Sequence, residues 1–202
     1  TQQTGFSYIA QLRSWLPREI GGILWFGNDD GNMIAYVPIY CSNTERAECF
    51  NTPGADAVTF SDKNAFWVCN WVSNMVYPRY SQLFPALKEV RDSLDNAFLA
   101  AQKGVEAKAE ALYATDKAAA VKYLNDYSIQ KSNEMITRWR ELAIYLIVKF
   151  NDMTVKPEKD GKFLRTSTGL GERVKRTGYS DYFKRELVKQ TGDKFAVPNK
   201  LN

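Results

Sequence analysis

The chain has 202 residues, of which 45% are hydrophobic and 13% aromatic, so it is long enough to bury a substantial core. Its formal net charge of +4 is small for this length and does not indicate a nucleic-acid partner. The sequence contains no histidine, which excludes a Ser-His-Asp triad, a Cys-His pair and most zinc sites. No uncharged apolar run reaches membrane-spanning length, so we expect no membrane partner. We also expect no metal, because histidine is absent and the cysteines have no other ligand type between them.

Three consecutive strands are predicted near the start of the chain. Residues 4–13 alternate in polarity, and apolar segments follow at about 20–26 and 33–40. Between these two segments, Gly-Asn-Asp-Asp-Gly-Asn at 27–32 is typical of a hairpin turn. The stretch GGILWFG (21–27) is apolar on both faces, as in a strand at the centre of a sheet that is covered on both sides. The pattern therefore predicts part of a layered core whose other strands lie outside this sequence.

Two of the three cysteines bracket a polar loop. Cys41 and Cys49 are separated by a spacing that a local disulfide can close, and we predict this bridge, with a stabilisation of roughly 2–3 kcal/mol. Such a bridge indicates an oxidising compartment. Cys69 lies in an aromatic helical stretch and is predicted to be a buried, unreactive thiol.

The apolar period becomes helical after residue 60. Ser61 and Asp62 are suitable caps for the first helix, which Pro78 should end. The two longest helices are predicted to pair antiparallel as a hairpin. The predicted helices cover residues 61–76, 82–113, about 116–126, 128–150 and 180–190.

We divide the chain into three parts of a single structural unit. Residues 1–60 supply antiparallel strands that complete the core sheets, and residues 61–152 form a helical layer with the long hairpin. Residues 153–202 form a tail with one short helix and an excess of Lys and Arg over Asp and Glu. Such a tail is most simply a solvated surface, because it contains no nucleic-acid-binding module.

Candidate site residues lie at the two ends of the first predicted strand. Gln3, Thr4 and Arg13 are polar groups on a strand otherwise suited to burial, and we predict that they bind substrate. Contacts at a sheet edge or loop are the alternative role for these three side chains. A terminal Thr1 could also act as a nucleophile that uses its own α-amine as base, although a simple chain boundary is the favoured explanation, since a terminal residue has no prior claim to be a nucleophile.

Segments of the sequence resemble the C-terminal half of bacterial cysteine-type dipeptidases of the dipeptidase A family, which are N-terminal-nucleophile hydrolases. The segments that carry the resemblance are QTGFSYIAQLRSWLPREIGGILWFG, YVPIYC and AFWVCNWVSNMVYPRYSQ. The resemblance implies an α+β fold with four αββα layers, to which this chain contributes antiparallel strands and the long helical hairpin. It also implies an exported protein, periplasmic or secreted, that needs no cofactor.

In this family an N-terminal cysteine attacks the scissile carbonyl of a short peptide, with its own α-amine as base. That nucleophile lies upstream of the segment seen here, so none of Cys41, Cys49 or Cys69 is expected to be catalytic. The resemblance therefore implies that this chain is inactive alone and needs the N-terminal half of the same protein. A non-enzymatic helical module that adds its strands to a partner sheet, and an N-terminal-threonine amidohydrolase subunit, remain the alternatives.

Overall fold

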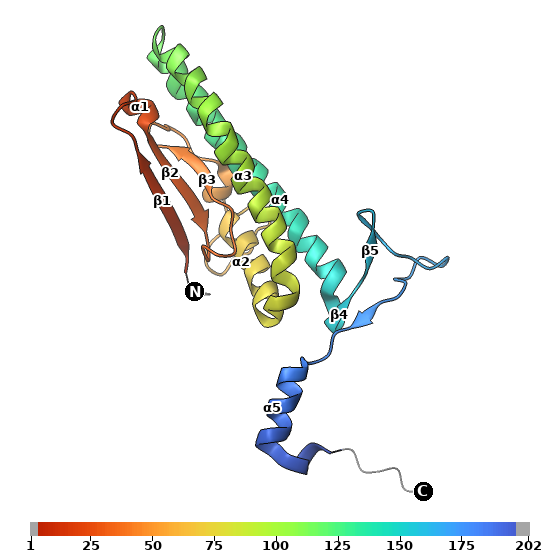
Figure 1. Cartoon of the computed structure of the whole chain (residues 1–202). Helices are drawn as coiled ribbons and strands as arrows, with labels where there is room; N and C mark the ends of the chain where they lie inside the picture. The colour runs from red at the N-terminus through yellow and green to blue at the C-terminus, as the bar shows by residue number, and fades with distance from the viewer. Residues whose placement is uncertain (1–3, 197–202) are drawn as a thin grey trace, which may run out of the picture. The chain divides into compact units, whose positions relative to one another are not determined.

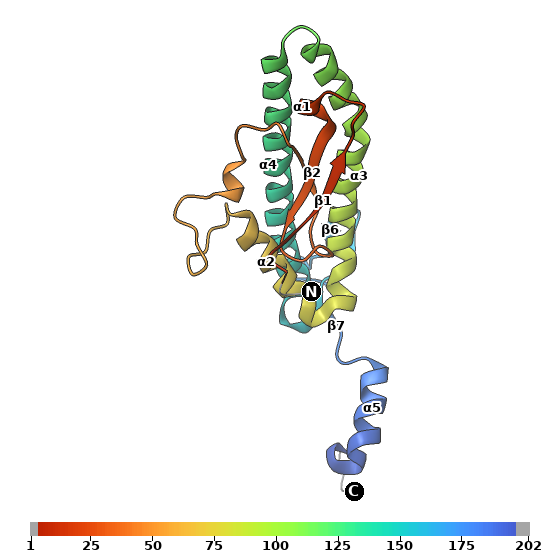
Figure 2. The same cartoon turned by 90° about the vertical axis from the view of Figure 1, so that its left-hand side faces the viewer.

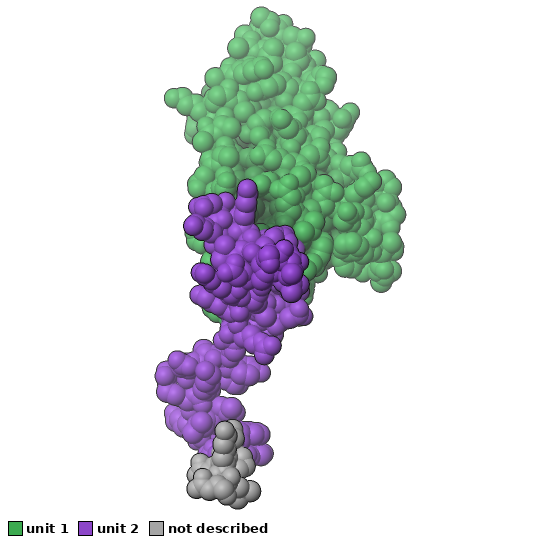
Figure 3. Space-filling model, turned by 90° about the vertical axis from the view of Figure 1, so that its right-hand side faces the viewer, with its two compact units in different colours: residues 1–147 green, residues 148–202 purple. Residues whose placement is uncertain are grey.

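The structure is a computed structural model that describes residues 4–196. The chain divides into two compact units, Thr1–Ile147 and Val148–Asn202 (Figure 3). Gln3 and Thr1 lie outside the described residues.

The first unit contains a three-stranded antiparallel sheet of order β1-β2-β3 (Figure 1). Its strands are β1 (Phe6–Leu12), β2 (Gly22–Asn28) and β3 (Val37–Tyr40), with a short helix α1 (Arg18–Gly21) between the first two. The central position predicted for β2 is confirmed, whereas the cover predicted on both faces of the sheet is seen on the helix-facing side alone among the described residues. The third strand is shorter than predicted, because residues 33–36 belong to the turn and bury their side chains there without pairing.

Long helices cover one side of this sheet (Figures 1 and 2). The helices are α2 (Ala65–Val76), α3 (Tyr80–Tyr113) and α4 (Lys117–Phe150), with 3-10 turns η1 (Glu48–Phe50) and η2 (Tyr77–Arg79). The predicted antiparallel pairing of the two long helices is seen for α3 and α4. The mixed α+β class is thereby confirmed.

Two helix predictions need correction. The helix after residue 60 begins at Ala65, because the Asn64 side chain caps it by accepting a hydrogen bond from the Trp67 N–H at 3.2 Å. The segments predicted as separate helices at 116–126 and 128–150 form the single helix α4. Ser128 does not cap a new helix there; its Oγ lies 3.4 Å from the Tyr40 amide of β3 and accepts from it.

The two faces of the sheet differ in burial. On the helix-facing side, Ile23 and Trp25 of β2 are 0% and 7% exposed. On the opposite side, which Figure 2 shows in front of α3 and α4, Phe6, Tyr8 and Leu12 of β1 are 58%, 58% and 76% exposed. We call this side the outer face. The sheet therefore has one well-buried face and one face on which large apolar side chains are exposed.

The second unit consists of short elements. Its α5 begins after Ser180, whose Oγ accepts from the Phe183 N–H at 3.1 Å, in agreement with the predicted helix at 180–190. The elements are η3 (Asn151–Met153), β4 (Thr154–Val155) paired with β7 (Lys175–Arg176), β5 (Glu158–Lys159) paired with β6 (Lys162–Phe163), α5 (Asp181–Thr191) and η4 (Gly192–Phe195). Among residues 4–196, every helix is too short or too polar to cross a membrane.

Candidate functional site

Two adjacent acids leave the end of β2 and are almost completely buried. Asp29 is 1% exposed and Asp30 is 6% exposed. Asp29 adopts a left-handed backbone conformation with φ of 74°, which is uncommon for a residue other than glycine. Its N–H donates to the Gly5 carbonyl at 2.9 Å, so this turn lies against the segment that leads into β1. We call residues 28–30 the acid turn.

The two acids are bound differently. Asp30 accepts hydrogen bonds from the Asn32 N–H at 3.1 Å and from the Tyr77 hydroxyl. Asp29 Oδ2 is buried and makes no hydrogen bond of standard geometry among the described residues, although hydrogen bonding by the Ser73 and Asn70 side chains of α2 acts on the pKa of its carboxyl. Six other buried side-chain atoms of the described residues lack such a bond, so this oxygen marks a site only together with the backbone conformation and the pKa of Asp29.

Burial raises the pKa of the Asp29 carboxyl above its ordinary value. The side chains of Ser73 and Asn70, on α2, partly oppose this shift, and the charge of Asp30 adds to it. A carboxyl group with a raised pKa can hold its proton at a higher pH and act as a hydrogen-bond donor. A perturbed acid, a left-handed backbone and an unpartnered oxygen in one place make the acid turn the candidate site.

The predicted site residues do not come together. Thr4 is half-buried and precedes Gly5, so it lies in the segment beside the acid turn. Arg13 follows the far end of β1, about 30 Å from Thr4 at the usual rise of a strand. Gln3 lies outside the described residues.

Arg13 is engaged by the protein itself. Its guanidinium pairs with Glu106 of α3 and donates to the carbonyls of Gly21 at 3.3 Å and Ile20 at 3.2 Å. The side chains of Arg13 and Glu106 are only 8% and 12% exposed. These contacts hold the β1–β2 connection on α3, which corresponds to the alternative, structural role of this arginine.

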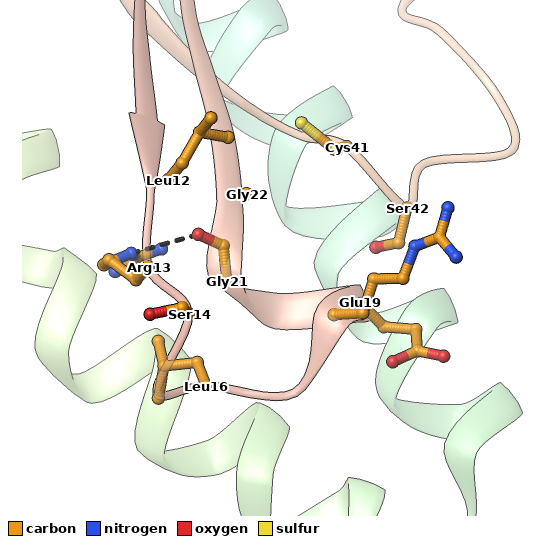
Figure 4. A pocket seen from close by; sticks show the side chains of 10 residues that line it. Leu12, Arg13, Ser14, Leu16, Glu19, Gly21, Gly22, Cys41 and Ser42 are labelled. Carbon is orange, nitrogen blue, oxygen red and sulfur yellow. Dashed lines mark hydrogen bonds between the residues drawn. The ribbon is translucent and has the colours of Figure 1, made fainter.

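A hollow of about 730 Å³ lies beside Arg13 (Figure 4). Its walls include Leu12, Glu19 and Gly22 from the β1–β2 connection and Cys41 and Ser42 from the end of β3. Figure 4 shows the Arg13 side chain directed at the Gly21 carbonyl. Of the two arginines that line the hollow, Arg13 is thus already used by the protein and Arg18 is exposed, and the hollow is a weaker candidate because it has no buried acid like those of the acid turn.

The three cysteines are free in the structure, which therefore lacks the predicted Cys41–Cys49 bridge. Cys41 is exposed at the end of β3 with its Sγ against Gly22, whereas Cys49 is buried in η1. Burial raises the pKa of Cys49 to about 11 and raises that of Cys69 well above its ordinary value. Neither buried thiol is suited to act as a nucleophile. The inference of an oxidising compartment from this bridge has no support in the structure.

Thiol labelling should distinguish these states. In the native protein without reductant, iodoacetamide is expected to modify one cysteine, Cys41, because Cys49 and Cys69 are 4% and 0% exposed. After unfolding, all three should react, as measured by intact mass. If Cys41 and Cys49 were bridged, only one thiol would react in the unfolded, unreduced protein.

The sequence of the acid turn is typical of a hairpin turn and does not by itself indicate a site. Asn and Asp are common in turns, and the sequence lacks the regular acid spacing of a calcium loop. The one feature of the sequence that could have indicated buried acids is the apolar residues on both sides of the turn. In the structure Met33 and Ile34, which follow the turn, are 0% and 1% exposed. Within residues 4–196 no group of three or more acids or cysteines is arranged to hold a metal ion.

Comparison with known families supplies the remaining evidence. The model of peptidase family C69 matches residues 1–93. The matched segment is 93 of the 202 residues, slightly less than half of the chain. The C69 segment contains the three-stranded sheet, the acid turn, α2 and the first part of α3, together with Arg13 and all three cysteines. The resemblance to the dipeptidase A family is thereby confirmed for this segment, and no curated protein matches the chain.

Proposed function

We propose that the chain is the C-terminal portion of a cysteine-type dipeptidase that hydrolyses short peptides. The observation that carries this proposal is the family match of residues 1–93, which supports a peptidase. The nucleophile in this proposal is a cysteine on polypeptide outside these 202 residues. The burial of Cys49 and Cys69, and the elevated pKa of each, support that assignment.

The outer face supports the incomplete layer structure that this proposal requires. Phe6 and Phe26 stack there with ring centroids 6.1 Å apart, and Phe26 meets the Phe50 ring edge-on at 5.4 Å. A second sheet packed on these side chains would bury them and produce the two central layers of a four-layer αββα arrangement. The helices α3 and α4, which lie on the opposite side of the three-stranded sheet, would then form one of the two outer helical layers.

In this proposal the acid turn contributes to the peptide site as a positioning element. A free dipeptide carries an α-ammonium group, for which buried carboxyl oxygens are suitable partners. The carboxyl of Asp29 lies near Ser73 and Asn70 of α2, while its backbone N–H binds the Gly5 carbonyl before β1. Asp30 supports the turn through Asn32 and Tyr77.

The test compares the chain alone with the chain co-expressed with the polypeptide encoded upstream of it. We expect no dipeptide hydrolysis by the chain alone, because removal of a nucleophile costs on the order of 10⁶-fold in turnover. Hydrolysis should appear on co-expression and should fall when Asp29→Ala is introduced. Asp56→Ala, at an exposed acid in another turn, is the matched control. Turnover by the chain alone that survives Cys41→Ser would contradict the proposal.

A further inference from the structure

A small hollow lies between α4 and the connection from η1 to α2, within the first unit. Figure 2 shows this connection, drawn in orange and yellow, beside α4. The hollow has a volume of about 300 Å³. Its residues from α4 are spaced by three and four positions and therefore share one face of the helix; they are Asn133, Ile136, Thr137 and Arg140. Lys63, which precedes α2, lines the hollow from the connection, so two cations distant in sequence share it.

The two cations of this hollow have no counter-ion in the protein. Among the described residues, neither Arg140 nor Lys63 makes an ion pair, and Arg140 is half-buried. Glu141, which follows Arg140 in the sequence, pairs instead with Arg138 at 3.1 Å. The positions three and four residues from Arg140 in either direction hold no acid, so α4 supplies no partner for it. Two unpaired cations that share a hollow repel each other unless an anion lies between them.

The remaining lining residues suit a small anion. The Thr137 hydroxyl and the Asn133 amide can each donate a hydrogen bond, and both are on the face of α4 that carries Arg140. The buried part of the lining is apolar, since Ile136 and Cys49 are 5% and 4% exposed. A lining from which water is excluded strengthens hydrogen bonds and ionic attraction beside it.

We propose that this hollow binds a phosphoryl group, either as free phosphate or as a small phosphate ester, between Arg140 and Lys63. A guanidinium can bind two oxygens of such a group in parallel, and the lysine ammonium can bind a third. Glu48 is the single acid that lines the hollow, and the two cations outweigh its charge. The bound group would join α4 to the segment before α2. The inference is independent of the proposed function, because no residue of the acid turn lines this hollow.

Isothermal titration calorimetry of the full chain with sodium phosphate tests the site, with the ionic strength held constant by sodium chloride. We expect saturable one-to-one binding. Arg140→Met should weaken it about tenfold or more, as expected for the loss of hydrogen bonds between charged groups. Glu48→Gln should strengthen it, because a like charge is removed from beside the anion. Arg138→Met is the matched control on the same helix and should leave the affinity unchanged, since Arg138 pairs with Glu141 and does not line the hollow.

Absence of saturable binding in the millimolar range would overturn the inference. So would equal phosphate affinities for Arg140→Met and Arg138→Met, with circular dichroism confirming that both variants fold. Glycerol phosphate in place of phosphate distinguishes the two sources of the phosphoryl group. Comparable or tighter binding of glycerol phosphate supports the site with a phosphate ester as its ligand, and binding of phosphate alone supports it with the free ion.

Alkylation of Cys49 locates the bound ion, because this thiol lines the hollow. In a Cys41→Ser background, iodoacetamide reaches the buried Cys49 only when the structure opens locally. Saturating phosphate should slow this reaction, as measured by the mass of the peptide that contains Cys49, and should have no such effect in Arg140→Met. An unchanged rate at saturating phosphate would place the ion elsewhere and overturn the inference.

Discussion

Replacement of Arg13 by Met is expected to lower the free energy of unfolding by about 3–5 kcal/mol, as seen when one partner of a buried ion pair is removed. The substitution leaves Glu106 buried and uncompensated, since that side chain is only 12% exposed. It also removes the donors to the carbonyls of Ile20 and Gly21, which fix the connection between β1 and β2. Urea unfolding followed by tryptophan fluorescence measures the change.

Two variants control this prediction. Arg138→Met breaks a surface pair with Glu141, whose partners are 49% and 59% exposed, and should change stability by only about 0–1 kcal/mol. The double variant Arg13→Met with Glu106→Leu should recover much of the loss, because no unpaired charge remains buried. An Arg13→Met protein as stable as Arg138→Met would show that the buried pair does not hold the connection.

Asp29→Asn is expected to raise stability at pH 7–8 by about 1–3 kcal/mol, the order of a buried group's desolvation penalty, because the neutral amide avoids the cost of burying a carboxylate. The folded-state pKa of Asp29 is raised, so its favourable contribution is complete below the unfolded-state pKa and is lost as pH rises through the folded-state pKa. The advantage of the Asn variant should therefore be smallest near pH 3 and increase with pH. Thermal unfolding over a pH series measures it.

Asp56→Asn should show the opposite pH dependence. Hydrogen bonds from the Val58 backbone and the Thr59 side chain lower the pKa of the exposed Asp56 carboxyl. Its favourable contribution is present above the unfolded-state pKa and is lost as pH falls, so the Asn variant should lose stability at neutral pH and match the parent protein in acid.

A pH-independent effect of Asp29→Asn would show that its carboxyl is not destabilised when ionised. Stabilisation together with loss of activity in the assembled enzyme would be the trade-off expected of a functional site.

Local patterns were sufficient for the strands and most helices. The apolar residues on both faces of β2 predicted its central position, and the structure confirms it. The sequence predicted two helices where the structure has the single helix α4, because serine is a residue type that favours helix N-caps. In the structure this serine contacts β3, and Ser132 Oγ donates to its carbonyl at 2.8 Å within the helix. The contact between Ser128 and Tyr40 joins residues 88 positions apart and leaves no local signal in the sequence.

The sequence by itself determined the order of strands and helices, the apolar character of both sides of the sheet and the family match of residues 1–93, because periodicity and motif are local properties. Only the tertiary structure decided which polar side chains are buried and which groups they pair with. Arg13 and Glu106 are 93 positions apart, and their pairing turns a candidate substrate ligand into a structural support. In the sequence, Asp29 resembles an ordinary turn residue. In the structure it lies beside Ser73 and Asn70 of α2 and is only 1% exposed to solvent. Burial and long-range pairing set the chemistry of a side chain, and both are properties of the folded chain.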